Sequence, residues 1–201
     1  MPRPLNPKWK RPSRSKVNRR EKRKKFLIVC EGGRTEPFYF EGFRFKVSIT
    51  LKVEGLGYNT IRLVREAIRL SKQDDYDQVW CVFDRDSFPR QNFNDALDWA
   101  RQAGIEVAYS NEAFEIWYLL HFHYHDSATS RDLYKGMLTD RLGFKYEKND
   151  PNMYDRLESR QQDAIRNAEK LLSSYVPHRP ADDNPCTTVH HLVQALNAFA
   201  V

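Results

Sequence analysis

Two short, uninterrupted apolar runs limit the fold more than any other feature of this chain. They are FLIVC at residues 26–30 and VWCVF at residues 79–83, which is followed by Asp84 in the strand VWCVFD. A strand with one wet face alternates apolar and polar residues, whereas a strand covered on both faces is apolar throughout. The two runs therefore predict central strands of a sheet that carries helices on both sides.

Segments with helical patterns alternate with strand patterns over the first 110 residues. We expect helices over residues 36–45, 60–73 and 93–103, and two further strands, VSITLKVE at 47–54 and IEVAYS at 105–110. Asn59 is a good N-cap for the second helix, and Gly104 ends the third. Strands that alternate with helices are typical of βαβ units, so we predict a mainly parallel four-stranded sheet in an α/β fold.

The pattern becomes helical after the fourth strand. NEAFEIWYLLHFHYH at 111–125 is expected to be helical in its first ten residues, with Asn111 or Ser110 as the cap. Three further helical segments follow, SRDLYKGMLTDRLG, YDRLESRQQDAIRNAEKLLSSY and CTTVHHLVQALNAFA. We therefore divide the chain into an arm at 1–25, an α/β domain at 26–125 and a helical extension at 126–201 that packs on it.

Charge is distributed very unevenly along the chain. Residues 1–25 carry 12 Lys and Arg against one acid, Glu21, whereas the other 176 residues carry 21 bases and 26 acids. The basic segment is rich in proline and poor in apolar residues, so we expect it to be disordered when free. Basic arms of this kind bind nucleic acid by releasing condensed counterions from its phosphates, although a solubilising tail has the same composition.

The cysteines and the hydropathy pattern indicate a cytoplasmic protein. Cys30, Cys81 and Cys186 are odd in number, lie far apart and form no CxxC pair. No apolar run reaches the roughly 20 residues that span a bilayer, and the basic N-terminal segment lacks the apolar core of a secretory signal. We expect reduced thiols and no membrane partner.

Both central strands end in acidic residues. Glu31 follows the first strand directly, while Asp84 and Asp86 end the VWCVFD strand two residues apart, a spacing that points both side chains to one side. Ligands of parallel sheets bind at the carboxyl ends of the strands. Carboxylates gathered there repel each other unless a hard cation neutralises them, so the pattern predicts Mg²⁺, or Mn²⁺, as cofactor.

At this point the sequence resembles a known family. FLIVCEGGRTEPFYF followed by VWCVFDRDSF is similar to a TOPRIM domain, and the Glu31–Glu36 spacing is closest to the TOPRIM variant of OLD-family nucleases. The chain resembles the RloB-like family more closely still, through the blocks CEGGRTEPFYF, FDRD, SNEAFEIWYLLHF and NPCTTVHHLVQAL, from residue 26 to about 196. The resemblance implies a TOPRIM-like fold, a prokaryotic source, a role beside restriction or CRISPR systems in phage defence, and metal-dependent nuclease relatives.

The resemblance also implies roles for the strand-end acids. Glu31, Asp84 and Asp86 would be metal ligands, and Glu36 would serve a second metal or its outer shell. Glu31 has a second interpretation as general base. Two metals about 4 Å apart would activate water and stabilise the leaving oxygen in phosphodiester cleavage.

Further candidates surround these acids. Glu115 and Asn111 follow the fourth strand and reach the same edge of the sheet if that strand is parallel. His190, near the start of the last helical segment, is a candidate acid or phosphate contact. Arg34, Arg85 and Lys135 are candidate phosphate clamps. The run HFHYHD at 121–126 departs from the HxHxDH zinc pattern, so we expect core or surface histidines there, with His121 close to the site.

These observations favour a metal-dependent nuclease that acts on RNA, such as tRNA, or on DNA. There are two alternatives. One is an accessory subunit that binds metal and nucleic acid without cleaving it, and the other is a phosphotransferase or nucleotide-processing enzyme that uses the same acids. The sequence contains no GxxxxGK[ST] segment, the phosphate-binding motif of P-loop ATPases, which argues against that class of enzyme. The expected partners are nucleic acid, reached through the basic arm and the acidic site, together with a defence-system protein or a second copy of the chain.

Overall fold

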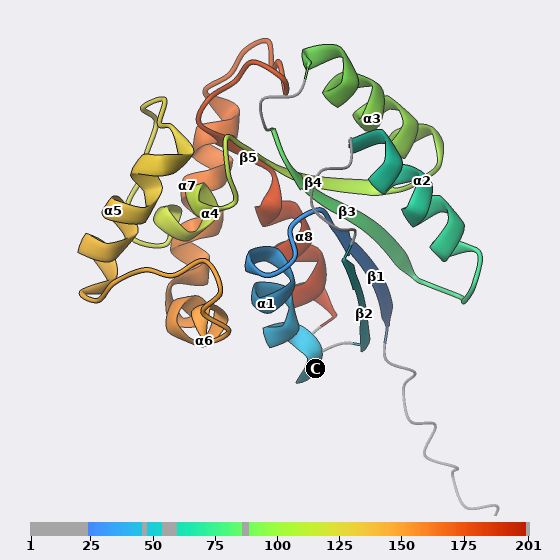
Figure 1. Cartoon of the computed structure of the whole chain (residues 1–201), viewed down its shortest axis with the longest axis horizontal. Coiled ribbons are helices and arrows are strands. Elements are labelled where there is room, and N and C mark those ends of the chain that lie inside the picture. The colour runs from blue at the N-terminus through green and yellow to red at the C-terminus, as the bar shows by residue number, and fades with distance from the viewer. Residues whose placement is uncertain (1–23, 46–47, 54–59, 86–88, 200–201) are drawn as a thin grey trace, which may run out of the picture.

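The computed structural model describes residues 24–45, 48–53, 60–85 and 89–199. Its centre is a five-stranded sheet with the order β2-β1-β3-β4-β5 (Figure 1). The strands are β1 (Lys25–Cys30), β2 (Ser48–Val53), β3 (Gln78–Asp84), β4 (Glu106–Asn111) and β5 (Cys186–Thr187). Four of them are parallel neighbours, as the alternating pattern predicted.

The fifth strand corrects the prediction of four. β5 runs antiparallel to β4, with Ser110 opposite Thr187 and Asn111 opposite Cys186. It lies in a segment expected to be helical from residue 186, but the following helix, α8, spans Val189–Ala198. A strand of two residues is too short to show any alternation in sequence, and only its pairing with β4 identifies it.

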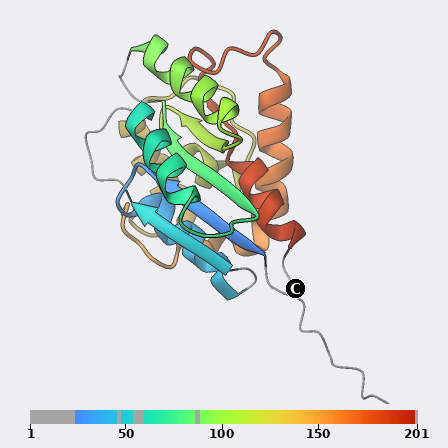
Figure 2. The same ribbon diagram turned by 90° about the vertical axis from the view of Figure 1, so that its right-hand side faces the viewer.

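Helices cover both faces of the sheet. On one face lie α2 (Thr60–Ser71) and α3 (Arg90–Gln102), and the remaining helices cover the other face (Figures 1 and 2). Those remaining elements are α1 (Thr35–Glu41), the 3₁₀ helix η1 (Gly42–Phe45), α4 (Glu115–Leu120), α5 (Arg131–Leu142), α6 (Met153–Leu157), η2 (Glu158–Arg160), α7 (Gln161–Ser173) and α8.

The alternation of side chains along β1 explains its unbroken apolar sequence. Leu27 and Val29 pack with α2 and α3, whereas Phe26, Ile28 and Cys30 pack on the opposite side, and all five are fully buried. β3 is divided between the two cores in the same way. Both faces of these strands are shielded from solvent by packed side chains, which confirms the layered α/β arrangement inferred from the apolar runs.

Two helix boundaries differ from expectation. Ser110 and Asn111 do not cap a helix; they are the last residues of β4, and α4 begins at Glu115. Pairing with β5 keeps the backbone extended at Asn111, and its side chain donates a hydrogen bond to the Asp183 carbonyl at 2.8 Å. The long helical run expected over 154–175 is divided into α6, η2 and α7.

Residues 1–23 of the expected basic arm lie outside the described residues. Lys25, expected to be its last residue, is the first residue of β1. Lys24 and Lys25 form ion pairs with Asp77 and Asp74 at 2.7 and 2.5 Å, in the turn before β3. These contacts fix the start of β1 against that turn.

The helices after residue 126 share one core with the sheet. Tyr134, Leu157, Leu171 and Leu192 belong to the same buried cluster as Phe26 of β1. Tyr39 of α1 is near its centre, surrounded by aromatic rings. Those rings come from Phe40, Phe43, Phe114, Trp117, Tyr118, His121 and Tyr154.

In the described part of the chain, none of the helices combines the length and apolar character that crossing a bilayer demands.

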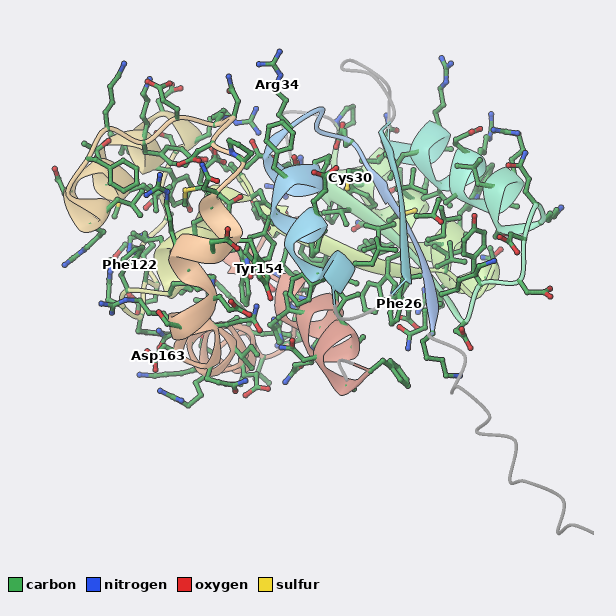
Figure 3. All side chains as sticks on the ribbon, turned by 90° about the horizontal axis from the view of Figure 1, so that it is seen from below. Phe26, Cys30, Arg34, Phe122, Tyr154 and Asp163 are labelled. Atoms are coloured by element: carbon green, nitrogen blue, oxygen red, sulfur yellow. The ribbon has the colours of Figure 1, made fainter. Side chains whose placement is uncertain are left out.

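Close approach of α6 to α1 depends on a glycine. A Cβ on Gly42 would overlap the ring of Tyr154, which lies against this end of α1 (Figure 3).

We expect Gly42→Ala to destabilise the fold by about 1–3 kcal/mol, because the ring has to move out of a filled core. Gly136→Ala on the exposed face of α5, where nothing lies within 4 Å, is expected to stabilise by about 0.5–1 kcal/mol through helix propensity. Urea denaturation checks both; equal effects of the two variants contradict the packing described here.

Candidate active site

The carboxyl ends of β1, β3 and β4 bring the predicted acids together. β1 and β3 are parallel neighbours, and the Glu31 amide donates to the Val82 carbonyl at 2.9 Å. Asp84 is the last residue of β3 and pairs in register with Ser110 of β4. Glu31 and Asp84 therefore lie at one sheet edge, as their positions after two buried strands predicted. Asp86 lies outside the described residues.

Two glutamates from helices join this edge. Glu36 is the second residue of α1 and is 5% exposed, and Glu115 is the first residue of α4 and is 3% exposed. The Glu36 carboxylate lies directly over Gly32, where a Cβ would overlap its oxygens. The first glycine after Glu31 thus leaves room for a carboxylate, and we define Glu31, Glu36, Asp84 and Glu115 as the acidic cluster.

Burial and nearby negative charge make ionisation of Glu36 and Asp84 unfavourable. Desolvation, reinforced by the charge of Glu115, raises the pKa of Glu36 from 4.5 to about 7. Desolvation also raises the pKa of Asp84 well above its usual value, and the charges of Glu36, Glu115 and Glu31 add to this. The positive charge of Arg131 lowers the pKa of both Glu36 and Asp84 and so offsets part of the increase. The charge of Lys148 has the same effect on Glu36.

Basic and phenolic groups from the C-terminal half contact the acids. Arg131 Nη2 lies 3.4 Å from Asp84 Oδ2. Lys148 Nζ lies 3.2 Å from Glu115 Oε1, to which the Tyr146 hydroxyl donates at 3.3 Å. The sequence pattern did not indicate these three residues, because single basic or aromatic residues in helical or loop segments look like ordinary surface and core positions.

Every side chain of the acidic cluster ends in a carboxylate. Carboxylate oxygens are the ligands that Mg²⁺ and Mn²⁺ prefer. The Tyr134 hydroxyl is buried with no hydrogen-bond partner among the described residues. Burial raises its pKa, and the charges of Glu112, Glu115 and Asp84 add to this. This hydroxyl is thus a further oxygen donor close to the acids. Within the described ranges, no three His, Cys, Asp or Glu side chains form a ready-made metal site.

Arg85 and Asn111, two of the predicted substrate-binding residues, lie beside the acidic cluster. Both line a pocket of about 450 Å³ at the same sheet edge, which we call the arginine pocket. Its lining consists of Arg85, Arg90, Asn111, Glu112, Arg131, Ala181, Asp182 and Asn184. Arg90 and Asn184 were not indicated by the sequence, because they come from a helix start and from a loop of irregular structure.

The other candidate phosphate clamps lie elsewhere. Arg34 is exposed at the start of α1 and points away from the molecule (Figure 3). Lys135 is exposed on α5, and its charge helps to lower the pKa of Glu147. Neither residue lines the arginine pocket.

The candidate histidines are buried and uncharged. His190 on α8 is 1% exposed, and burial, with the neighbouring His191, lowers its pKa to about 3. His121 packs on Trp117 in the aromatic core, and its Nδ1–H donates to the Trp117 backbone carbonyl at 2.9 Å. Burial lowers the pKa of His121 to about 4. A neutral imidazole at His121 fits the core role expected for the HFHYHD run. The role of His190 as an acid or phosphate contact stays a prediction.

Comparison with known families agrees with the sequence resemblance. A model of the family described as RloB-like protein matches residues 26–196, which is most of the chain and all of the sheet except Lys25. The chain belongs to the RloB-like family. No match was found among curated proteins or among solved structures. The RloB-like match covers every element that contributes to the acidic cluster and the arginine pocket, from Glu31 to Asn184.

The position of Glu36 over Gly32 gives a steric test. Gly32→Ala is expected to push the Glu36 carboxylate out of the acidic cluster and to destabilise the fold by about 1–3 kcal/mol. Gly33→Ala is the matched control, because nothing lies within 4 Å of a Cβ there, and we expect a change below about 0.5 kcal/mol. Chemical denaturation measures both; a harmless Gly32→Ala would show that Glu36 does not lie where described.

The raised pKa of Glu36 predicts a pH-dependent effect of Glu36→Gln. Between pH 4.5 and about 7 the folded chain binds more protons at this group than the unfolded chain does, so wild-type stability falls as the pH rises through that window. Gln mimics the protonated form. In EDTA, the variant is expected to be more stable than wild type by about 2–3 kcal/mol at pH 8 and equal to it below pH 4.5.

Denaturant titrations at pH 4.5, 6 and 8 measure this difference. Glu106→Gln, exposed at the amino end of β4, is the control and should change stability by less than about 0.5 kcal/mol at every pH. If Glu36→Gln stabilises the fold by the same amount at every pH, the pKa of Glu36 is not raised by burial and by repulsion from neighbouring carboxylates.

Proposed function

We propose that this RloB-like protein is a nuclease that hydrolyses phosphodiester bonds with a divalent metal, Mg²⁺ or Mn²⁺. The observation that carries the proposal is the convergence of Glu31, Glu36, Asp84 and Glu115 at the carboxyl edge of three parallel strands, where ionisation of Glu36 and Asp84 is disfavoured. Four carboxylates held together in this way favour cation binding, because a cation removes their mutual repulsion.

The chain's own residues have distinct tasks in this proposal. Glu31, Glu36, Asp84 and, outside the described residues, Asp86 would hold the metal, which supplies the positive charge that polarises a phosphodiester and acidifies a bound water. Glu31 has an alternative task as the base that accepts the proton of the attacking water. Arg131 holds Asp84 in place through its guanidinium. Glu115, paired with Lys148 and Tyr146, holds the segment that carries these two residues beside the acidic cluster.

The substrate would be a nucleic acid, RNA such as tRNA or DNA. The strongly basic segment at residues 1–25 supports this, since the remainder of the chain is net acidic and needs a cationic element to attract a polyanion. We place the activity in the prokaryotic cytoplasm, in anti-phage defence, on the basis of the family resemblance and the three free, buried cysteines.

Asp84→Asn tests the proposal with almost no change in shape. Pure protein is incubated with labelled tRNA, single-stranded RNA and plasmid DNA, in Mg²⁺, Mn²⁺ or EDTA. We expect metal-dependent cleavage that falls at least about 100-fold in the variant, the scale of losing one charged group from a catalytic site. Asp86→Asn is expected to behave in the same way.

Asp163→Asn is the matched control, because this acid lies on α7 in an exposed ion pair with Arg166. It should leave cleavage unchanged. Nucleic-acid binding without cleavage under every condition would support the accessory-subunit alternative instead, and cleavage that survives Asp84→Asn would place the reaction elsewhere in the molecule.

A further inference from the structure

The Tyr134 hydroxyl is a buried polar group that the described part of the chain leaves without an acceptor. Tyr134 lies on α5 and is fully buried, and its hydroxyl has no hydrogen-bond partner among the described residues. A buried donor without an acceptor costs free energy, because it gives up its hydrogen bond to water on folding. A phenylalanine would fill the same volume without this cost, so the hydroxyl points to a partner that comes from outside the chain.

The side of α5 that carries Tyr134 is turned toward the acidic cluster. Arg131 precedes Tyr134 by one helical turn, so the two side chains lie on the same side of α5. The Arg131 guanidinium lies 3.4 Å from Asp84 Oδ2. The same helix packs on α4, which begins at Glu115. Tyr134 therefore lies against the strand end and the helix start that supply two members of the acidic cluster.

Electrostatic effects on Tyr134 agree with this placement and fix the direction of the hydrogen bond. Burial raises the pKa of Tyr134, and nearby negative charge raises it further. The charges belong to Glu112, Glu115 and Asp84. The phenol therefore keeps its proton, and it acts as a donor toward an oxygen that carries negative charge.

The acids around Tyr134 receive their hydrogen bonds from other groups. The Glu112 carboxylate accepts from the Arg131 amide at 3.3 Å and from the Asn184 side chain at 3.4 Å. Glu115 is contacted by a lysine and a tyrosine of the segment that follows α5. Tyr134 donates to none of these acids. An oxygen that enters the acidic cluster from outside would be its acceptor.

We propose that the Tyr134 hydroxyl donates a hydrogen bond to an oxygen ligand held at the acidic cluster. Resting on the proposed function, this oxygen belongs either to a water that the cation carries or to a phosphate group. Ionised carboxylates supply acceptors only, so the hydroxyl adds a donor to the acidic cluster. A donor fixed in a packed core needs no reorganisation when the oxygen arrives, and burial strengthens the bond.

Thermal unfolding in EDTA separates this role from packing. Tyr175→Phe is the matched control, because the Tyr175 hydroxyl donates to the Pro185 carbonyl at 2.8 Å. We expect this control to lower the Tm of the full chain by about 2–4 °C, since an internal hydrogen bond is lost. Tyr134→Phe is expected to leave the Tm unchanged or to raise it. A fall as large as that of the control would mean that the hydroxyl has a partner within the chain, and would overturn the proposal.

Ligand titrations of the full chain identify the oxygen. Calorimetry measures the affinity for Mn²⁺ alone and for inorganic phosphate at saturating Mn²⁺. We expect Tyr134→Phe to weaken one of these affinities by about 3- to 10-fold, the effect of losing one hydrogen bond, and Tyr175→Phe to change neither. Weaker binding of Mn²⁺ identifies a water that the cation carries. Weaker binding of phosphate at an unchanged Mn²⁺ affinity identifies a phosphate oxygen, and unchanged affinities for both would overturn the proposal.

Cleavage assays of the same variants keep this inference separate from the proposed nuclease activity. If Tyr134→Phe weakens Mn²⁺ or phosphate binding while wild type cleaves no nucleic acid, the nuclease proposal fails and the role of Tyr134 stands. If wild type cleaves with metal and Asp84→Asn does not, while Tyr134→Phe changes neither affinity, the nuclease stands and the role of Tyr134 fails.

Discussion

Repulsion among buried carboxylates is the constraint on which the rest of this structure depends. Glu36 and Glu115 are buried at one sheet edge, where water screens their charges poorly, and Asp84, whose side chain is 20% exposed, lies beside them at the end of β3. Placing them there costs free energy unless opposite charge is supplied. A protein that keeps such a cluster gives up stability at that edge, which is typical of a site built for binding or chemistry.

The C-terminal half supplies that opposite charge. Arg131 at the start of α5 contacts Asp84, and the segment between α5 and α6 brings Lys148 and Tyr146 to Glu115. The Thr35 hydroxyl donates to the Lys148 carbonyl at 3.0 Å, which ties this segment to the start of α1. The part of the chain that follows α4 therefore contributes to the site, in addition to covering the core.

The segment before β5 completes the arginine pocket in a similar way. Asp183 is nearly buried, with its carboxylate 2.5 Å from His178 Nδ1, and His178 Nε2 lies 2.7 Å from the Tyr109 hydroxyl of β4. This chain of polar contacts holds the loop that carries Ala181, Asp182 and Asn184 against the sheet edge. The loop that lines the charged, solvent-accessible arginine pocket is thus held in position by hydrogen bonds to buried polar groups behind it.

The sequence alone determined the layered α/β fold and the place of the first acids. Apolar runs such as FLIVC have to be covered on both faces, and a strand of that kind fixes where its following residue, Glu31 or Asp84, emerges. Local patterns also gave most helices to within a few residues. They misplaced the start of α4 and did not indicate β5, because both depend on the pairing of Asn111 with Cys186, 75 residues along the chain.

Only the tertiary structure decided which charged residues meet. Arg131, Lys148 and Arg90 have no local pattern that separates them from solvated surface residues, and Arg34 and Lys135 look equally suitable in sequence yet lie elsewhere. A carboxylate at a strand end is positioned by the two-residue period of its own strand. Its cationic partner is positioned by the packing of distant helices, so proximity between the two is a property of the fold and not of any segment.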